Sequence, residues 1–193
     1  ATCNQVVTVI DNQAPVLTVP SLSSLVKDYQ FTSLSGVGLE DLSSGATTIF
    51  GSNFINQSNL PISLPFNFTY KSTVQTLFSV STNGLLGFGI TPVGTSGSNN
   101  SNNTLLPSSY FNTLCVYWDA LHTGTNGSVR YKVFGNAPTR KLVIEWNVRN
   151  NSELVPTATK QFQAWLFEGS NKIQYVYGVG TNSTALGSTI GLR

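Results

Sequence analysis

The sequence predicts an all-β protein folded as an antiparallel β-sandwich or jelly roll. Many short segments alternate apolar and polar residues with a period of two, which is typical of strands with one face on a core and one toward solvent. No window carries the i, i+3, i+4, i+7 spacing of an amphipathic helix. Turn residues separate the alternating segments, and many short strands between turns favour a sandwich or jelly roll.

Each strand is predicted from its own alternation. Such segments run over residues 64–70, about 74–82, about 85–90, 129–133, 142–148 and 173–177. Asn83-Gly84 separates the second and third of them, and Asn-Gly favours a two-residue type I′ turn because both positions need positive φ. We therefore expect these two strands to form an antiparallel hairpin.

The remaining segments predict loops and a junction. Residues 91–109 are polar and of low complexity, and residues 150–160 are shorter and similarly polar. Residues 11–27 contain Pro15 and Pro20 and are typical of a junction between modules.

The composition indicates an extracellular protein. Only 9% of the 193 residues are charged, against roughly 25% in an average soluble domain. The 19 Asn, 23 Ser and 22 Thr residues provide a neutral polar surface instead, as on extracellular fibres and adhesins. The ten Lys and Arg residues are scattered, so no nucleic-acid partner is expected. The sequence has no run of roughly 18 apolar residues, so no membrane span is predicted.

Two kinds of covalent modification are expected of an exported chain. Cys3 and Cys115 are compatible with one disulfide in an oxidising compartment, although their spacing does not show that they pair with each other. Asn-X-Ser/Thr sequons, whose glycosylation depends on the host, make the chain a candidate glycoprotein. They begin at Asn56, Asn67, Asn99, Asn102, Asn126, Asn150 and Asn182.

No catalytic site is predicted. His122 is the only histidine, and a loop histidine after a strand is favoured over a triad member. Alternation with Trp146 places Glu145 on a wet face, so no glycosidase-like pair of carboxylates is expected. We expect no cofactor, with calcium as an open possibility. Its ligands would be Asp119 and Asn126, or Asp11-Asn12 at the junction.

The three tryptophans have different expected positions. Trp118 and Trp146 share the parity of apolar neighbours and are predicted to be core residues. Trp165 lies with Phe167 on the face opposite Ala164 and Leu166. Either both faces of this strand are covered, or Trp165 and Phe167 form an exposed aromatic platform for a glycan or a protein.

The first fifteen residues resemble the end of a hyalin repeat. They contain Cys3, the apolar run Val6-Val7-Thr8-Val9-Ile10 and then Asp11-Asn12-Gln13-Ala14-Pro15. The hyalin repeat is an immunoglobulin-like sandwich whose last strand carries a Cys and runs into an Asp-x-x-Ala-Pro linker. The resemblance implies that residues 1–24 are the last strand and linker of a neighbouring module, most of which, with the usual partner of Cys3, is missing.

The rest of the chain, residues 25–193, resembles the nidogen-like (NIDO) module of large secreted proteins of Bacteroidetes. The similar motifs, in order, are Leu64-Pro65-Phe66-Asn67-Phe68, Phe78-Ser79-Val80-Ser81-Thr82-Asn83-Gly84, Tyr117-Trp118-Asp119-Ala120-Leu121, Arg140-Lys141-Leu142-Val143-Ile144-Glu145-Trp146, Phe162-Gln163-Ala164-Trp165-Leu166-Phe167 and Ile173-Gln174-Tyr175-Val176-Tyr177. The resemblance implies a β-sandwich within a long adhesin, surface fibre or exported multidomain enzyme. It implies no catalytic residues.

These observations together predict a non-catalytic module at the cell surface, acting as a spacer, an adhesive unit or a subunit of a fibre. Its partners would be neighbouring modules or subunits, held in part by strand exchange at unguarded sheet edges. The uncharged residues 1–10 are a candidate donated strand. The alternative is a carbohydrate-binding accessory module of a secreted hydrolase, centred on Trp165 and Phe167.

Overall fold

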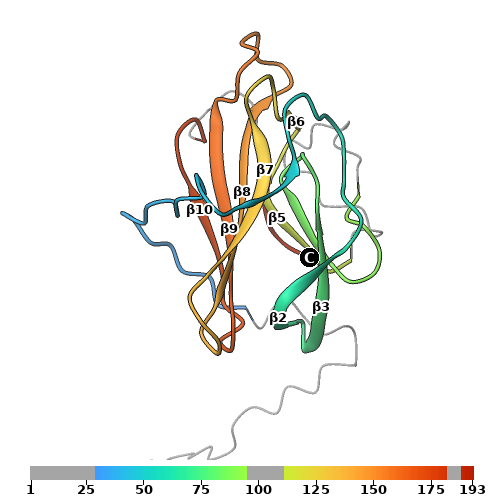
Figure 1. The fold of residues 1–193 in the computed structure, drawn as a ribbon, viewed down its shortest axis with the longest axis vertical. Coiled ribbons are helices and arrows are strands. Elements are labelled where there is room, and N and C mark those ends of the chain that lie inside the picture. The colour runs from blue at the N-terminus through green and yellow to red at the C-terminus, as the bar shows by residue number, and fades with distance from the viewer. Residues whose placement is uncertain (1–28, 95–110, 182–187) are drawn as a thin grey trace, which may run out of the picture.

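The computed structural model describes residues 29–94, 111–181 and 188–193, and in this part of the chain it contains strands and no helix. Two antiparallel sheets face each other as a sandwich (Figure 1), so the predicted fold class is confirmed. The predicted junction at 11–27, most of the polar loop at 91–109 and the candidate donor strand at 1–10 lie outside the described residues.

The first sheet has the strand order β1-β7-β8-β9-β10, and the short strand β6 pairs with β8 beside this path. Its strands are β1 (Thr47–Phe50), β6 (Leu121–His122), β7 (Ser128–Phe134), β8 (Lys141–Asn150), β9 (Lys160–Phe167) and β10 (Ile173–Tyr177). The second sheet has the order β11-β5-β4-β3-β2. Its strands are β2 (Ile62–Tyr70), β3 (Thr73–Val80), β4 (Leu85–Phe88), β5 (Thr113–Trp118) and β11 (Thr189–Leu192).

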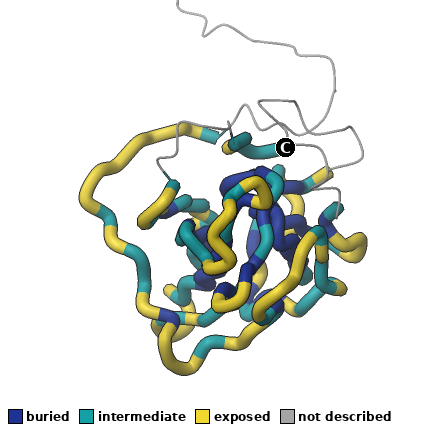
Figure 2. The backbone as a smooth tube through the Cα atoms, turned by 90° about the horizontal axis from the view of Figure 1, so that it is seen from above, coloured by how far each residue is buried: buried dark blue, intermediate teal, exposed yellow. Residues whose placement is uncertain are grey.

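The core lies between the two sheets and is rich in aromatic rings. Trp146 on β8 is fully buried, stacks on Phe162 with ring centroids 5.3 Å apart, and donates from Nε1 to the Ser81 carbonyl at 2.8 Å. This hydrogen bond joins the two sheets and satisfies the polar atom of a buried indole. Figure 2 shows buried backbone gathered in the middle of the molecule with exposed loops around it. Trp118 is also buried, but in a separate cluster with Leu85, Val93 and Cys115.

The predicted hairpin at Asn83-Gly84 is confirmed, whereas its predicted turn type is wrong. Strands β3 and β4 pair antiparallel, but of the two turn residues only Gly84 has a positive φ, of 79°. Ser81 N donates to the Leu85 carbonyl and Gly84 N donates to the Ser81 carbonyl, which makes a three-residue loop that ends in a left-handed glycine. The two-residue turn with positive φ at both positions is instead Lys71-Ser72, between β2 and β3.

The physical reason for the difference is a tertiary contact of Asn83. Its side chain is fully buried, accepts from the Leu121 amide at 3.0 Å and donates to Asn56 Oδ1 at 3.1 Å. The longer loop directs this amide inward, where it satisfies a buried backbone donor that a surface turn residue would not reach.

The outer face of the first sheet is covered by residues 39–46, which we call the strap. Leu42 of the strap packs on Val143, Trp165 and Val176, all of them buried. Glu40 N donates to Gln163 Oε1 at 2.9 Å, and Gln163 Nε2 donates to the Glu40 carbonyl at 2.8 Å. The side-chain amide of Gln163 thus pairs with the strap as a neighbouring backbone would.

The prediction that Glu145 points to solvent is wrong, because the outer face under the strap is not wet. Glu145 is only 1% exposed. Its carboxylate accepts from Arg130 Nε at 2.8 Å and, through its other oxygen, from the side-chain amides of Gln161 and Gln163 at 3.1 and 2.8 Å. Alternation correctly placed Glu145 opposite Trp146, but the strap and these donors bury that face as well.

Candidate binding site

A sheet edge is the place where this fold can add another chain. In the described ranges, the two main strand paths end at β1 and β10 in the first sheet and at β2 and β11 in the second, beside the two-residue strand β6. The pairing register shifts within β1, β2 and β11, and β2 also contains Pro65, which has no N–H to donate. Bulges and prolines are the usual means by which edges resist further pairing. Strand β10 pairs with β9 over five residues without a shift. It is therefore the most regular edge in the described part of the chain.

The hydrogen-bond ladder determines which backbone groups of β10 point away from the sheet. Phe167 N donates to the Lys172 carbonyl at 3.0 Å, and Gly178 N donates to the Gln161 carbonyl at 2.8 Å. Because antiparallel pairs alternate, the residues between these two positions that bond to β9 are Gln174 and Val176. The N–H and C=O groups of Ile173, Tyr175 and Tyr177 consequently point outward. Within the described ranges, no strand pairs with them.

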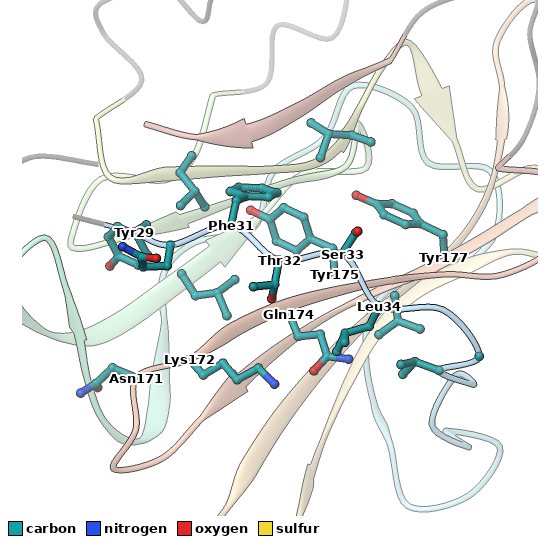
Figure 3. A pocket seen from close by; sticks show the side chains of 17 residues that line it. Tyr29, Phe31, Thr32, Ser33, Leu34, Asn171, Lys172, Gln174, Tyr175 and Tyr177 are labelled. Carbon is teal, nitrogen blue, oxygen red and sulfur yellow. The ribbon is translucent and has the colours of Figure 1, made fainter. Parts of the chain in front are cut away.

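A groove with a volume of about 560 Å³ runs along this edge. All five residues of β10 line it, whereas a pocket on one face of a strand would be lined by alternate residues only. Its other long wall is formed by residues 29–37, which we call the arm, and Ile190 and Leu192 of β11 close it from the second sheet. Figure 3 shows the arm passing beside β10 with tyrosine and phenylalanine side chains between them.

The floor of the groove is held by two tyrosines. Tyr175 donates its hydroxyl to the Gly191 carbonyl at 3.1 Å, and Tyr177 donates to the Val116 carbonyl at 2.8 Å. These bonds tie the edge of the first sheet to the second. Burial raises the pKa of both phenols, so they remain neutral donors at physiological pH.

The wall opposite β10 is apolar and incompletely packed. Phe31 and Leu34 of the arm are 76% and 67% exposed, and Ile190 is about half exposed. Lys172 is the charged residue among those lining the groove, and it stands at the start of β10. A largely apolar groove beside outward-pointing backbone donors and acceptors can recognise an extended polypeptide through its main chain and its apolar side chains.

The predicted aromatic platform is wrong for Trp165. Its ring is only 7% exposed, it packs on Leu42 of the strap, and its Nε1 donates to Gln163 Oε1 at 2.8 Å. The Lys141 ammonium lies 3.8 Å from the centroid of the same ring. Phe167 is half buried and packs against the same cluster. Both faces of β9 are covered, which is the other possibility that the sequence left open.

The candidate calcium ligands make other contacts. Asp119 is buried and accepts from Ala120 N and Asn150 Nδ2 at 2.7 and 2.8 Å, and burial raises the pKa of its carboxyl. Asn126 is exposed and accepts from Ala158 N at 2.7 Å. The described residues contain no group of three or more His, Cys, Asp or Glu side chains that could hold a metal. Calcium at Asp119 and Asn126 stays a prediction, and Asp11-Asn12 lies outside the described residues.

The single histidine has a structural contact. His122 Nδ1 accepts from the Gly124 amide at 3.0 Å, which assigns its proton to the other ring nitrogen. Partial burial lowers the pKa of this imidazole and favours its neutral form. The predicted loop position is wrong, because His122 lies in the short strand β6 and pairs with Arg149 of β8.

The predicted glycosylation sites differ in accessibility. Asn67 and Asn126 are exposed and Asn56 is half buried, whereas Asn99, Asn102 and Asn182 lie outside the described residues. Asn150 is buried, and its side chain bonds Asp119 and the Ser152 amide and hydroxyl. A glycan on Asn150 would break these bonds, so this site does not fit the folded structure.

Cys115 is a free and buried thiol, and its predicted partner Cys3 lies outside the described residues, so their disulfide stays a prediction. Burial raises the pKa of the Cys115 thiol from 9.0 to about 12, which lowers its thiolate fraction near neutral pH by about a thousandfold. In the Cys3→Ser variant, we expect iodoacetamide at pH 8 to leave the native protein unmodified. In denaturant, the same reagent should add a single alkyl group, at Cys115. Intact mass measures both. Complete alkylation of the native protein within minutes would contradict the buried position.

The groove along β10 was not predicted from the sequence. Alternation identified Ile173–Tyr177 as a strand but carried no sign that it forms an edge. The nearest signal was the tyrosine pair Tyr175 and Tyr177 on one face, which would equally suit a core position.

Comparison with known proteins identifies a family for this chain. The model of a family described as "NIDO related" matches residues 28–193. No curated protein and no solved structure matches the chain. Across the described ranges, the fold offers no helix with the length and hydrophobicity of a membrane span.

Proposed function

Because this chain belongs to the NIDO-related family, which points to an extracellular module, we propose that it is a non-catalytic part of a surface protein that makes structural or adhesive contacts with other polypeptides. The observation that carries the proposal is the groove along β10, where a regular edge and exposed apolar residues of the arm meet. Exposed apolar surface beside unpaired backbone groups is characteristic of protein-binding sites.

The acidic side chains support a non-catalytic function. Each of the six carboxylates in the described residues has a structural partner: Glu40 with Lys141, Asp41 with Ser43, Asp119 with Asn150, Glu145 with Arg130, Glu153 with Lys160 and Glu168 with Arg140. Two carboxylates of a hydrolase would instead converge on a cleft. The lone histidine is likewise bonded to a neighbouring amide.

A flow-adhesion assay tests the proposal. Beads coated with the full chain pass over surfaces that carry casein, as a source of extended polypeptide, or dextran, as a polysaccharide. We expect retention on casein, because many weak contacts on one bead add up. The double variant Phe31→Asp/Leu34→Asp should reduce this retention about tenfold or more, since charges would enter the apolar wall of the groove.

The matched control is Leu154→Asp, which places the same charge on a fully exposed leucine outside the groove. It should retain wild-type adhesion. Equal retention of the groove variant and the wild type would overturn the assignment of the groove. Hydrolysis of casein, dextran or a nitrophenyl ester by the purified chain would overturn the non-catalytic function.

A further inference from the structure

We propose that strand β10 accepts an extended strand from a second copy of this chain, namely residues 5–10, which adds to the outward edge of Ile173, Tyr175 and Tyr177. This inference rests on the proposed function and names the partner of the same groove. The acceptor is chosen because the three other edges carry a register shift, and one of them also a proline.

The groove fits a strand better than it fits a compact ligand. It runs along the full length of β10 and is lined by consecutive residues of both β10 and the arm, so its shape follows the backbone. An added strand would lie about 4.8 Å from β10 and would bond the outward N–H and C=O groups of alternate residues. Its apolar side chains would then contact Phe31, Leu34 and Ile190, which are exposed without it.

The donor segment has matching chemistry. Residues 5–10 are Gln5-Val6-Val7-Thr8-Val9-Ile10, five of which are β-branched and none of which is charged. Such residues favour an extended conformation and bring no charge of their own into the largely apolar groove. The segment is about as long as the five-residue edge of β10.

The position of this segment in the chain favours exchange between copies. It precedes Tyr29, the first described residue, which itself lines the groove. The intervening linker contains Pro15 and Pro20, each of which fixes φ and stiffens the chain. Because the two prolines restrict the paths by which residues 5–10 could return to the groove of their own chain, we assign the donor to a second copy. Because the donor and acceptor surfaces differ, the contact is head-to-tail and closes as a dimer or extends into longer assemblies.

The solution mass of the full chain is the first measurement. We expect multiples of 20.7 kDa that increase with protein concentration in analytical ultracentrifugation. The donor variant Val7→Pro/Thr8→Pro removes an N–H from both edges of the added strand, whichever edge faces β10, and should be monomeric. The control Thr2→Pro/Asn4→Pro introduces prolines outside the donor segment and should keep the wild-type mass.

Hydrogen exchange of the β10 amides tests the acceptor without any substitution in it. In the wild type, the amides of Ile173, Tyr175 and Tyr177 should exchange at least about tenfold more slowly than in the donor variant. A synthetic peptide of residues 5–10 should restore this protection to the donor variant. An acceptor variant, Tyr175→Pro, should remain monomeric alone yet form a mixed dimer with the donor variant, because each supplies what the other lacks.

Three results would overturn the inference. The first is a wild type that is monomeric and whose β10 amides exchange fast. The second is a donor variant that keeps the wild-type mass. The third is a monomeric wild type whose β10 protection depends on residues 7 and 8, which would assign the donor to the same chain. A monomeric protein whose beads still adhere to casein through the groove would end strand exchange but leave the proposed function intact.

Discussion

Replacing Glu145 with alanine should lower the free energy of unfolding by about 3 kcal/mol. The substitution leaves the Arg130 guanidinium and the side-chain amides of Gln161 and Gln163 without their acceptor on a covered face. Removing one member of a buried ion pair costs about 3–5 kcal/mol, and the lower end applies because Arg130 is partly exposed. Equilibrium unfolding in urea, followed by the fluorescence of the buried tryptophans, measures the change.

The matched control is Glu145→Gln, which keeps the size of the side chain and one acceptor oxygen. It should cost about 2 kcal/mol, the value of a hydrogen bond to a charged group, because it removes the charge beside Arg130 and turns one acceptor oxygen into a donor. The difference in unfolding free energy between the two variants gives the contribution of packing and of the remaining hydrogen bond, and the cost of the glutamine variant gives the contribution of the charge. If the unfolding free energy of the alanine variant lies within about 0.5 kcal/mol of the wild-type value, as for a surface substitution, Glu145 does not organise this face.

Gly84→Ala should destabilise the protein by about 3 kcal/mol or more, or prevent folding. A methyl group at this position would stand 2.1 Å from the Tyr117 carbonyl oxygen, which is backbone and cannot turn aside. The left-handed φ of 79° adds about 1–2 kcal/mol for any residue with a side chain. Overpacking contributes about 1–3 kcal/mol more, because β4 and β5 have to separate. The midpoint of thermal or urea unfolding gives the result.

Gly36→Ala is the control for this prediction. Gly36 has nearly the same φ, 77°, but among the described residues no atom lies within 4 Å of the added methyl. It should therefore show only the cost of the left-handed backbone, about 1–2 kcal/mol. Equal effects of the two substitutions would mean that the close approach of Gly84 to Tyr117 contributes nothing.

The strands themselves were predictable because alternation is a local property. Every second residue from 142 to 148 is apolar, and the segment lies in β8 with Leu142, Ile144, Trp146 and Val148 in the main core. Trp118 shows the limit of this reasoning. Parity placed it with Leu114 and Val116, yet it lies in the separate cluster with Cys115, and the register between β5 and β11 shifts close to this point. A local irregularity inverts the face of every residue beyond it.

The Asn-Gly pair illustrates a similar division. The dipeptide correctly predicted a reversal of the chain between two strands. It did not predict the geometry of the loop, because the buried amide of Asn83 bonds to residues 27 positions before it and 38 positions after it. Turn preferences describe a loop in isolation, whereas these bonds form only when β6 and the segment before β2 are in place.

The all-β class, the position of most strands and the weakly charged surface could be predicted from the sequence alone, since each depends on neighbours along the chain or on composition. The burial of Glu145 and Trp165, the free edge of β10 and the groove beside it required the folded molecule. Whether a strand ends as an edge or a face is covered depends on which distant segments pair with it, and the strap and arm reach β8, β9 and β10 from more than a hundred residues away. Such long-range pairing leaves no period in the sequence, so the candidate binding site emerged only from the tertiary structure.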